Sequence, residues 1–132
     1  MIIARTDYAT MRREYSNAPL DETALAPNPL HQFDTWFKQA LEVSAMEPNA
    51  MHLGTVSRDG RPSLRVVLLK GIENDKFVFY TNLKSGKAKE LANNKACAAT
   101  FYWPELARQV RIEGDVLLIF INLRKCLPAI FQ

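Results

Sequence analysis

Cationic and amide side chains recur at three points in the sequence, each beside an expected strand or helix start. The first block is Arg65-Val66-Val67-Leu68-Leu69-Lys70, the second runs from Tyr80 to Lys87, and the third runs from Arg108 to Gly114. Charge-assisted hydrogen bonds from Arg and Lys, together with backbone N–H groups at a helix start, hold a phosphate strongly. The three blocks therefore predict a site for a small phosphorylated ligand, as is typical of a cofactor site.

One helix is predicted ahead of these blocks. Asn28 is a suitable N-cap before Pro29, and apolar residues from Leu30 to Leu41 then recur at helical spacing. We expect this helix to end near Met46. The preceding residues, 1–28, show no sustained periodicity and are predicted to form an N-terminal arm.

The pattern after this helix is that of strands. Asp59-Gly60 separates two apolar runs and predicts a hairpin. Ser85 is expected to cap a short helix that runs to about Ala92. Antiparallel strands joined by short turns predict a mainly β fold with short helices, a small barrel or sandwich over residues 29–115. The expected strands are 50–57, 62–70, 76–82, 96–102 and 108–113.

Composition narrows the class of protein. The chain has 132 residues, 48% hydrophobic and 23% charged, which predicts one ordinary globular domain. A net charge of +3 suits an anionic small-molecule ligand. The sequence lacks the clustered basic stripe that is expected of a nucleic-acid binder. The longest apolar run, 116–121, is far below the roughly 20 residues that span a bilayer. We expect a cytoplasmic protein that does not bind a membrane, with Cys97 and Cys126 as free thiols.

The three blocks, taken in order with other segments, resemble the pyridoxamine/pyridoxine 5'-phosphate oxidase family. These flavoproteins have the FMN-binding split-barrel fold. The similarity runs from about Met11 to about Gly114, and several motifs in order are far more specific than one alone. The additional segments are Arg12-Arg13-Glu14-Tyr15, residues 29–36, Ala50-Met51 and Phe101-Tyr102-Trp103.

This resemblance implies an antiparallel split barrel that binds FMN. It implies oxidation of pyridoxamine or pyridoxine 5'-phosphate to pyridoxal 5'-phosphate with oxygen as acceptor, in a homodimer with FMN at the subunit interface. By resemblance, Arg65 and Lys87 contact the FMN phosphate, and Gln109 bonds to the flavin ring. The implied cofactor-binding residues are Arg65, Val66, Val67, Leu68, Leu69, Lys70, Tyr80, Thr81, Gly86, Lys87 and Gln109. The implied substrate-binding residues are Lys70 and, in a mobile arm, Arg12, Arg13, Glu14 and Tyr15.

The chain departs from the family pattern at two places. Family members commonly have a second phosphate-binding Arg where this chain has Gly86, so one cationic contact is missing. They also continue after Gly114 with a charged segment and a Ser-Arg-Pro motif that this chain lacks. Residues 116–132 are therefore either a buried strand or foreign sequence from a truncated or frame-shifted reading frame, and the resemblance favours foreign sequence. We expect an incomplete barrel with impaired activity.

Other interpretations of the same residues stay open. Arg65 in an apolar strand is, on sequence alone, more often an edge residue with its head in water. Arg65 and Lys70 are five apart, so a regular strand places them on opposite faces unless a bulge intervenes. The first rival function is a flavin- or pyridoxal-phosphate-binding module without turnover.

A second rival is a nucleic-acid binder that stacks bases on aromatic residues. The aromatic candidates are Phe77, Phe79, Tyr80, Phe101, Tyr102 and Trp103. No metal site is expected, because His31 and His52 lack metal-ligand spacing. The sequence also contains no dinucleotide-binding, P-loop or hydrolase motif.

Overall fold

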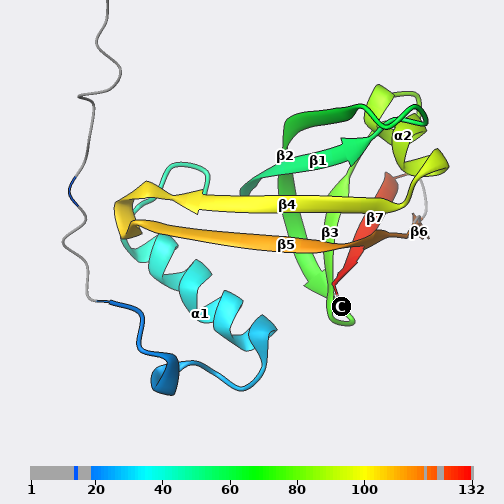
Figure 1. Cartoon of the computed structure of the whole chain (residues 1–132). Coiled ribbons are helices and arrows are strands. Elements are labelled where there is room, and N and C mark those ends of the chain that lie inside the picture. The colour runs from blue at the N-terminus through cyan, green and yellow to red at the C-terminus, as the bar shows by residue number, and fades with distance from the viewer. Residues whose placement is uncertain (1–13, 15–18, 118, 122–123, 132) are drawn as a thin grey trace, which may run out of the picture.

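The computed structural model describes residues 14, 19–117, 119–121 and 124–131, with backbone alone after residue 117. A sheet of seven strands curls around a core, with one helix against it and a second helix at its far end (Figure 1). The mainly β fold with short helices is confirmed. In chain order the elements are η2 (Glu22–Ala24), α1 (Pro29–Glu42), β1 (Ala50–Val56), β2 (Pro62–Glu73), β3 (Lys76–Tyr80), α2 (Gly86–Asn93), β4 (Ala96–Trp103), η3 (Pro104–Leu106), β5 (Arg108–Val116), β6 (Ile119–Ile121) and β7 (Arg124–Phe131).

Helix α1 begins where the sequence predicts and ends earlier. Asn28 accepts a hydrogen bond from the N–H of Leu30, with Pro29 at the first helical position. The predicted end near Met46 is wrong, because the helix stops at Glu42. Ser44 takes a left-handed conformation with φ 53°, and the N–H of Ala45 donates to the carbonyl of Ala40. This Schellman arrangement satisfies the last carbonyls and stops the helix without a glycine.

The Asp59-Gly60 hairpin between β1 and β2 is confirmed. The N–H of Ser57 donates to the carbonyl of Arg61 at 2.8 Å, and Gly60 has φ 84°. The hydroxyl of Ser57 donates to Asp59 at 2.7 Å and accepts from the N–H of Arg61 at 3.0 Å. The turn therefore sets the register in which Arg65 of β2 lies opposite Leu53 of β1.

The strands follow the order β3-β2-β1-β4-β5-β7-β6, and every pairing is antiparallel. Strand β7 also pairs with β3, so it lies between β3 and β5 and completes a closed circuit of strands (Figure 1). Val116, at the start of the segment that the sequence analysis set apart, is the last residue of β5. It is 4% exposed, and its N–H donates to the carbonyl of Lys95.

Aromatic residues form the centre of the core. The ring of Phe33 on α1 lies 4.9 Å from that of Phe77 and 5.0 Å from that of Phe101, both edge-on. Phe79 and Trp103 are also buried, and the Trp103 indole N–H donates to the carbonyl of Pro48. Four of the six aromatic residues proposed to stack bases therefore pack the core, which removes the main support for a nucleic-acid binder.

Cys97 is a free, half-buried thiol. Burial and the nearby Asp115 carboxylate raise its pKa to about 11. The side chain of Cys126 lies outside the described residues. Within the described part of the chain, no helix has the length and apolar character needed to cross a membrane.

Candidate functional site

Strand β2 divides the first motif between two faces of the sheet. Arg65 is half-buried, and Val67 and Leu69 are buried, so these three side chains alternate onto the inner face. Val66 and Leu68 point to the outer face. A β-bulge between Leu69 and Gly71 interrupts the alternation at Lys70, which is exposed. Arg65 thus lies on the inner face, and Lys70 is exposed at the bulge five residues further along the strand.

Arg65 is held by a polar network that reaches from β1 to α2. Its Nη1 donates to the carbonyl of Leu53 at 3.2 Å and to the hydroxyl of Thr55. Its Nη2 forms an ion pair with Glu90 at 3.3 Å. The side chains of Arg65 and Glu90 are 24% and 18% exposed, so both are partly shielded from water. Arg65 is thus not an edge residue with its head in water.

Glu90 accepts hydrogen bonds from two strands. The hydroxyl of Thr55 donates to Oε2, and the hydroxyl of Ser63 donates to Oε1 at 2.9 Å. These bonds, first that from Thr55 and then that from Ser63, lower the pKa of Glu90, and the charge of Arg65 lowers it further. The carboxylate is therefore ionised at neutral pH.

The N-terminus of α2 lies on the same side as this network. Ser85 caps the helix by accepting from the N–H of Ala88 at 3.3 Å, and its hydroxyl lies 3.4 Å from that of Thr81. Glu90 follows Gly86 by four residues and Lys87 by three, so the three share a helix face. Arg65 thus pairs with a residue that lies about one helical turn into α2.

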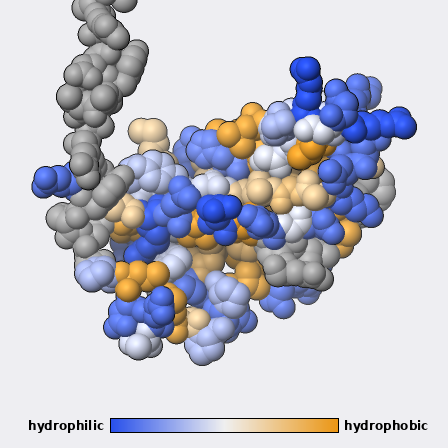
Figure 2. Space-filling view, viewed as in Figure 1, coloured by the Kyte–Doolittle hydropathy of each residue, from blue (hydrophilic) through white to orange (hydrophobic). Residues whose placement is uncertain are grey.

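This end of the molecule can accept an anion. The N–H groups of Gly86 and Lys87 occupy the first two helical positions and have no intrahelical acceptor. A side-chain carbon added at Gly86 would meet no atom within 4 Å, so the approach is open. The loop and helix carry Lys84, Lys87 and Lys89, and Figure 2 shows strongly hydrophilic side chains gathered over this end. The residues present fit a phosphate group.

The other predicted cofactor residues lie on the outer face. Gln109 of β5 is exposed opposite Tyr102 of β4, and Leu68 of β2 lies opposite Ala50 of β1. His52 of β1 lies opposite Thr100 of β4, so Ala50 and Tyr102 are level in the sheet. Since directly opposed residues share a face, Gln109 lies on the outer face with Leu68, away from Arg65. Tyr80 is exposed and Thr81 is buried. One chain therefore does not bring all the predicted residues together.

The arm is only partly described. Glu14 is exposed, whereas Arg12, Arg13 and Tyr15 lie outside the described residues. The next segment, 19–26, reaches the start of β5, where it lines a pocket of about 720 Å³ that includes Gln109. Arg108 of this pocket lies 4.7 Å from the Trp36 ring and donates to Gln39 at 2.7 Å. Burial lowers the pKa of Arg108.

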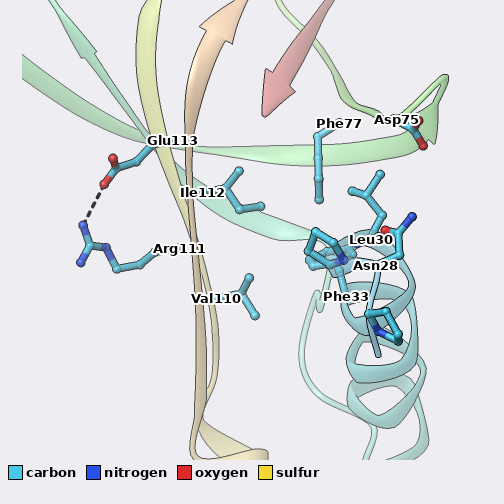
Figure 3. A pocket seen from close by; sticks show the side chains of 11 residues that line it. Asn28, Leu30, Phe33, Asp75, Phe77, Val110, Arg111, Ile112 and Glu113 are labelled. Atoms are coloured by element: carbon cyan, nitrogen blue, oxygen red, sulfur yellow. Dashed lines mark hydrogen bonds and ion pairs between the residues drawn. The ribbon is translucent and has the colours of Figure 1, made fainter. Parts of the chain in front are cut away.

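A second pocket, of about 690 Å³, lies between the start of α1 and strands β3 and β5. Figure 3 shows Val110 and Ile112 pointing toward α1, while Arg111 and Glu113 point away and form an ion pair at 3.0 Å. The pocket contains none of the predicted site residues. Phe33 and Phe77, which line it, belong to the hydrophobic core.

Sequence reasoning missed Thr55, Ser63 and Glu90. Ser63 and Arg65 are two apart in β2, and Lys87 and Glu90 are three apart in α2, so each pair shares a face. Those spacings could have suggested that polar side chains gather at one end of the inner face of the sheet. Among the described residues, no group of His, Cys, Asp or Glu side chains is placed to hold a metal ion.

The sequence matches the pyridoxamine 5'-phosphate oxidase family over residues 37–120. It is 54% identical over 106 residues to the pyridoxine/pyridoxamine 5'-phosphate oxidase of a Cyanothece species, covering 80% of this chain and 50% of that relative. The chain thus spans about half the length of this curated relative.

Two solved structures share the fold. PhzG from Burkholderia lata, in complex with tetrahydrophenazine-1-carboxylic acid, superposes with a TM-score of 0.74 at 27% identity, covering 80% of this chain and 54% of that one. A pyridoxamine 5'-phosphate oxidase-related, FMN-binding protein from Nostoc punctiforme gives 0.61 at 28% identity, covering 73% and 50%. These neighbours show that the barrel is of the split-barrel type.

Proposed function

This chain belongs to the pyridoxamine 5'-phosphate oxidase family, and we propose that it binds FMN through the anion site at the start of α2. The observation that carries this proposal is the ion pair between Arg65 and Glu90 of α2, the helix whose N-terminus is open. A dianionic phosphate there receives charge-assisted hydrogen bonds from Arg65 and Lys87, and backbone N–H groups from Gly86 and Lys87. Because position 86 is Gly and not Arg, one further cation is missing. We therefore expect a lower affinity for FMN than that of a relative with Arg at this position.

We further propose that the bound chain takes part in oxidising pyridoxamine or pyridoxine 5'-phosphate to pyridoxal 5'-phosphate. FMN, when bound, supplies the redox chemistry: a group that accepts a hydride and is reoxidised by oxygen. Side chains alone cannot do this. The chain's own residues bind and orient: Arg65 and Lys87 hold the phosphate, while Lys70 and the arm residues contact the substrate. The name of the Cyanothece relative supports this substrate class.

A homodimer is part of this proposal. In one chain, the phosphate-binding group around Arg65 lies on the inner face, whereas Gln109 lies on the outer face and Lys70 is exposed at the bulge of β2. A second copy placed against the outer face would combine one group from each chain. The outer face is suited to this contact, because Leu64, Val66 and Tyr102 are 69%, 57% and 50% exposed there.

The alternative function is a flavin- or pyridoxal-phosphate-binding module without turnover. One observation favours it: Gly86 stands where family members commonly carry a phosphate-binding Arg. Release of hydrogen peroxide from pyridoxamine 5'-phosphate and FMN distinguishes the two functions. Flavin binding with no peroxide supports the module, whereas peroxide release supports the oxidase.

Flavin titration tests the proposed site. We expect Arg65→Ala to weaken FMN binding about tenfold or more, since a charge-assisted bond contributes roughly 1.5–3 kcal/mol. Lys38→Ala is the matched control, because Lys38 pairs with Asp34 on the exposed face of α1. Quenching of flavin fluorescence gives both dissociation constants. Equal effects of the two substitutions would remove Arg65 from the site.

A further inference from the structure

The polar network around Arg65 contains a carboxylate to which the family motifs assign no role. Glu90 is the acidic residue of α2, and it accepts from Thr55 of β1, Ser63 of β2 and Arg65 of β2. An anion site gains nothing directly from a carboxylate, because the negative charge repels the phosphate. Glu90 nevertheless lies beside Arg65, the cation proposed to bind the phosphate. We therefore expect Glu90 to have a role other than direct contact with the anion.

The hydrogen bonds of Arg65 indicate that role. A guanidinium carries five N–H donors in a rigid plane. Three of them are used, by the carbonyl of Leu53, the hydroxyl of Thr55 and the carboxylate of Glu90. The other two, one on Nη2 and the one on Nε, have no acceptor among the described residues. Hydrogen bonds from both Nη1 and Nη2 fix its orientation and leave these donors for a ligand.

Glu90 is itself fixed. Both carboxylate oxygens of Glu90 accept hydrogen bonds from hydroxyls of the sheet, and these bonds hold the carboxylate against the sheet. The same contacts join α2 to β1 and β2. Orienting a long cationic side chain in advance removes part of the entropy cost of binding.

We infer that Glu90 is a positioning residue of the anion site, which holds the Arg65 guanidinium in the orientation that binds a phosphate. This inference rests on the proposed function for the identity of the ligand, the phosphate of FMN. Glu90 acts through Arg65 and makes no contact with the ligand. Its removal therefore harms phosphate binding only while Arg65 is present.

A double-mutant cycle tests this dependence. Dissociation constants for FMN are measured on the full chain, Glu90→Ala, Arg65→Ala and the double variant. We expect Glu90→Ala to weaken FMN binding about tenfold in the original background and less than about twofold in the Arg65→Ala background. Binding of riboflavin, which lacks the phosphate, should be unchanged by Glu90→Ala. Glu90→Gln keeps a hydrogen-bond acceptor and should restore affinity to within about threefold.

Two results would overturn the inference. Equal weakening by Glu90→Ala in both backgrounds would mean that Glu90 only stabilises the helix. Tighter FMN binding by Glu90→Ala or Glu90→Gln would mean that the carboxylate competes with the ligand. Asp34→Ala, which removes a carboxylate from an exposed ion pair on α1, is the matched control and should leave the FMN affinity unchanged.

A measurement without flavin separates this inference from the proposed function. The Nε–Hε NMR signal of Arg65, assigned with Arg65→Ala, should be sharp at neutral pH and should broaden in Glu90→Ala. A signal that does not respond to Glu90→Ala overturns the inference. If the unsubstituted chain fails to bind FMN while the signal does respond, the proposed cofactor is wrong and Glu90 still positions Arg65.

Discussion

Arg65 shows how surroundings decide the role of a single residue. The guanidinium of an Arg in an apolar strand is expected to extend into water. Only the order of the motifs along the sequence suggested that Arg65 binds a ligand. The structure half-buries this guanidinium beside Glu90, a pairing that offsets the cost of removing a charge from water. Arg65 is therefore held against α2 and does not extend into water.

Gly86→Arg should tighten FMN binding. An added Cβ meets no atom within 4 Å at this position, so a side chain can begin there without displacing the helix. One new charge-assisted contact to the phosphate should strengthen binding about tenfold or more. Flavin titration gives the affinity. Ala92→Arg adds the same charge at the other end of α2 and should have little effect, so equal gains would indicate general electrostatic attraction.

Part of the site could be predicted from sequence because it is local. The Ser85 cap and the hairpin at Gly60 depend on neighbours a few residues away, and both were predicted correctly. The pairing of Arg65 with Glu90 joins residues 25 apart, and no local pattern specifies it. Its partners became visible only when the hairpin and α2 had been placed in three dimensions.

At the scale of elements, α1 shows where hydrophobic periodicity is insufficient. The apolar stripe that includes Phe33 and Ala40 predicted the helix and the face that packs on the sheet. The end was misplaced, since Ser44 adopts a left-handed conformation that sequence patterns normally assign to glycine. The exposed Met46 lies beyond this stop, so its apolar character reflects no helical contact.

Gly60→Ala should destabilise the chain through the β1–β2 hairpin. Its φ of 84° favours glycine, and no atom lies within 4 Å of an added carbon, so the cost is one of backbone conformation alone. We expect a loss of about 1 kcal/mol from the free energy of unfolding, measured by urea denaturation. Gly86→Ala, in a helix with similar open space, should be neutral or stabilising. A similar loss in both would contradict the backbone explanation.

The contact between α2 and the sheet should depend on pH through Glu90. Its pKa is lowered in the folded chain from an ordinary value of 4.5. The stability it contributes is therefore present above that ordinary value and is lost as the pH falls through the lowered folded value. The melting temperature of the full chain should exceed that of Glu90→Gln at pH 7, and the difference should shrink below about pH 4.5. A difference independent of pH would exclude an ionised Glu90.

At the scale of the whole molecule, β7 determines whether the barrel is closed. Its backbone pairs with β3 on one side and with β5 on the other. Deleting residues 119–132 should leave two strand edges unpaired, which lowers the melting temperature and promotes aggregation. Circular dichroism and size-exclusion chromatography on the two chains measure both effects. An unchanged melting temperature would support the view that this segment is foreign to the fold.

Self-association is the property of the whole molecule on which the proposed site depends most. Leu64 is 69% exposed on the outer face of β2, where neighbouring apolar side chains extend the patch across the sheet. Leu64→Asp should convert a dimer into a monomer, because a charge cannot be buried against its own copy across a two-fold axis without strong repulsion. Light scattering after size-exclusion chromatography gives the mass. Leu41→Asp changes a leucine of 53% exposure on α1 and should leave the dimer intact. A monomeric unsubstituted chain, or equal dissociation by both variants, would refute a dimer formed through this face.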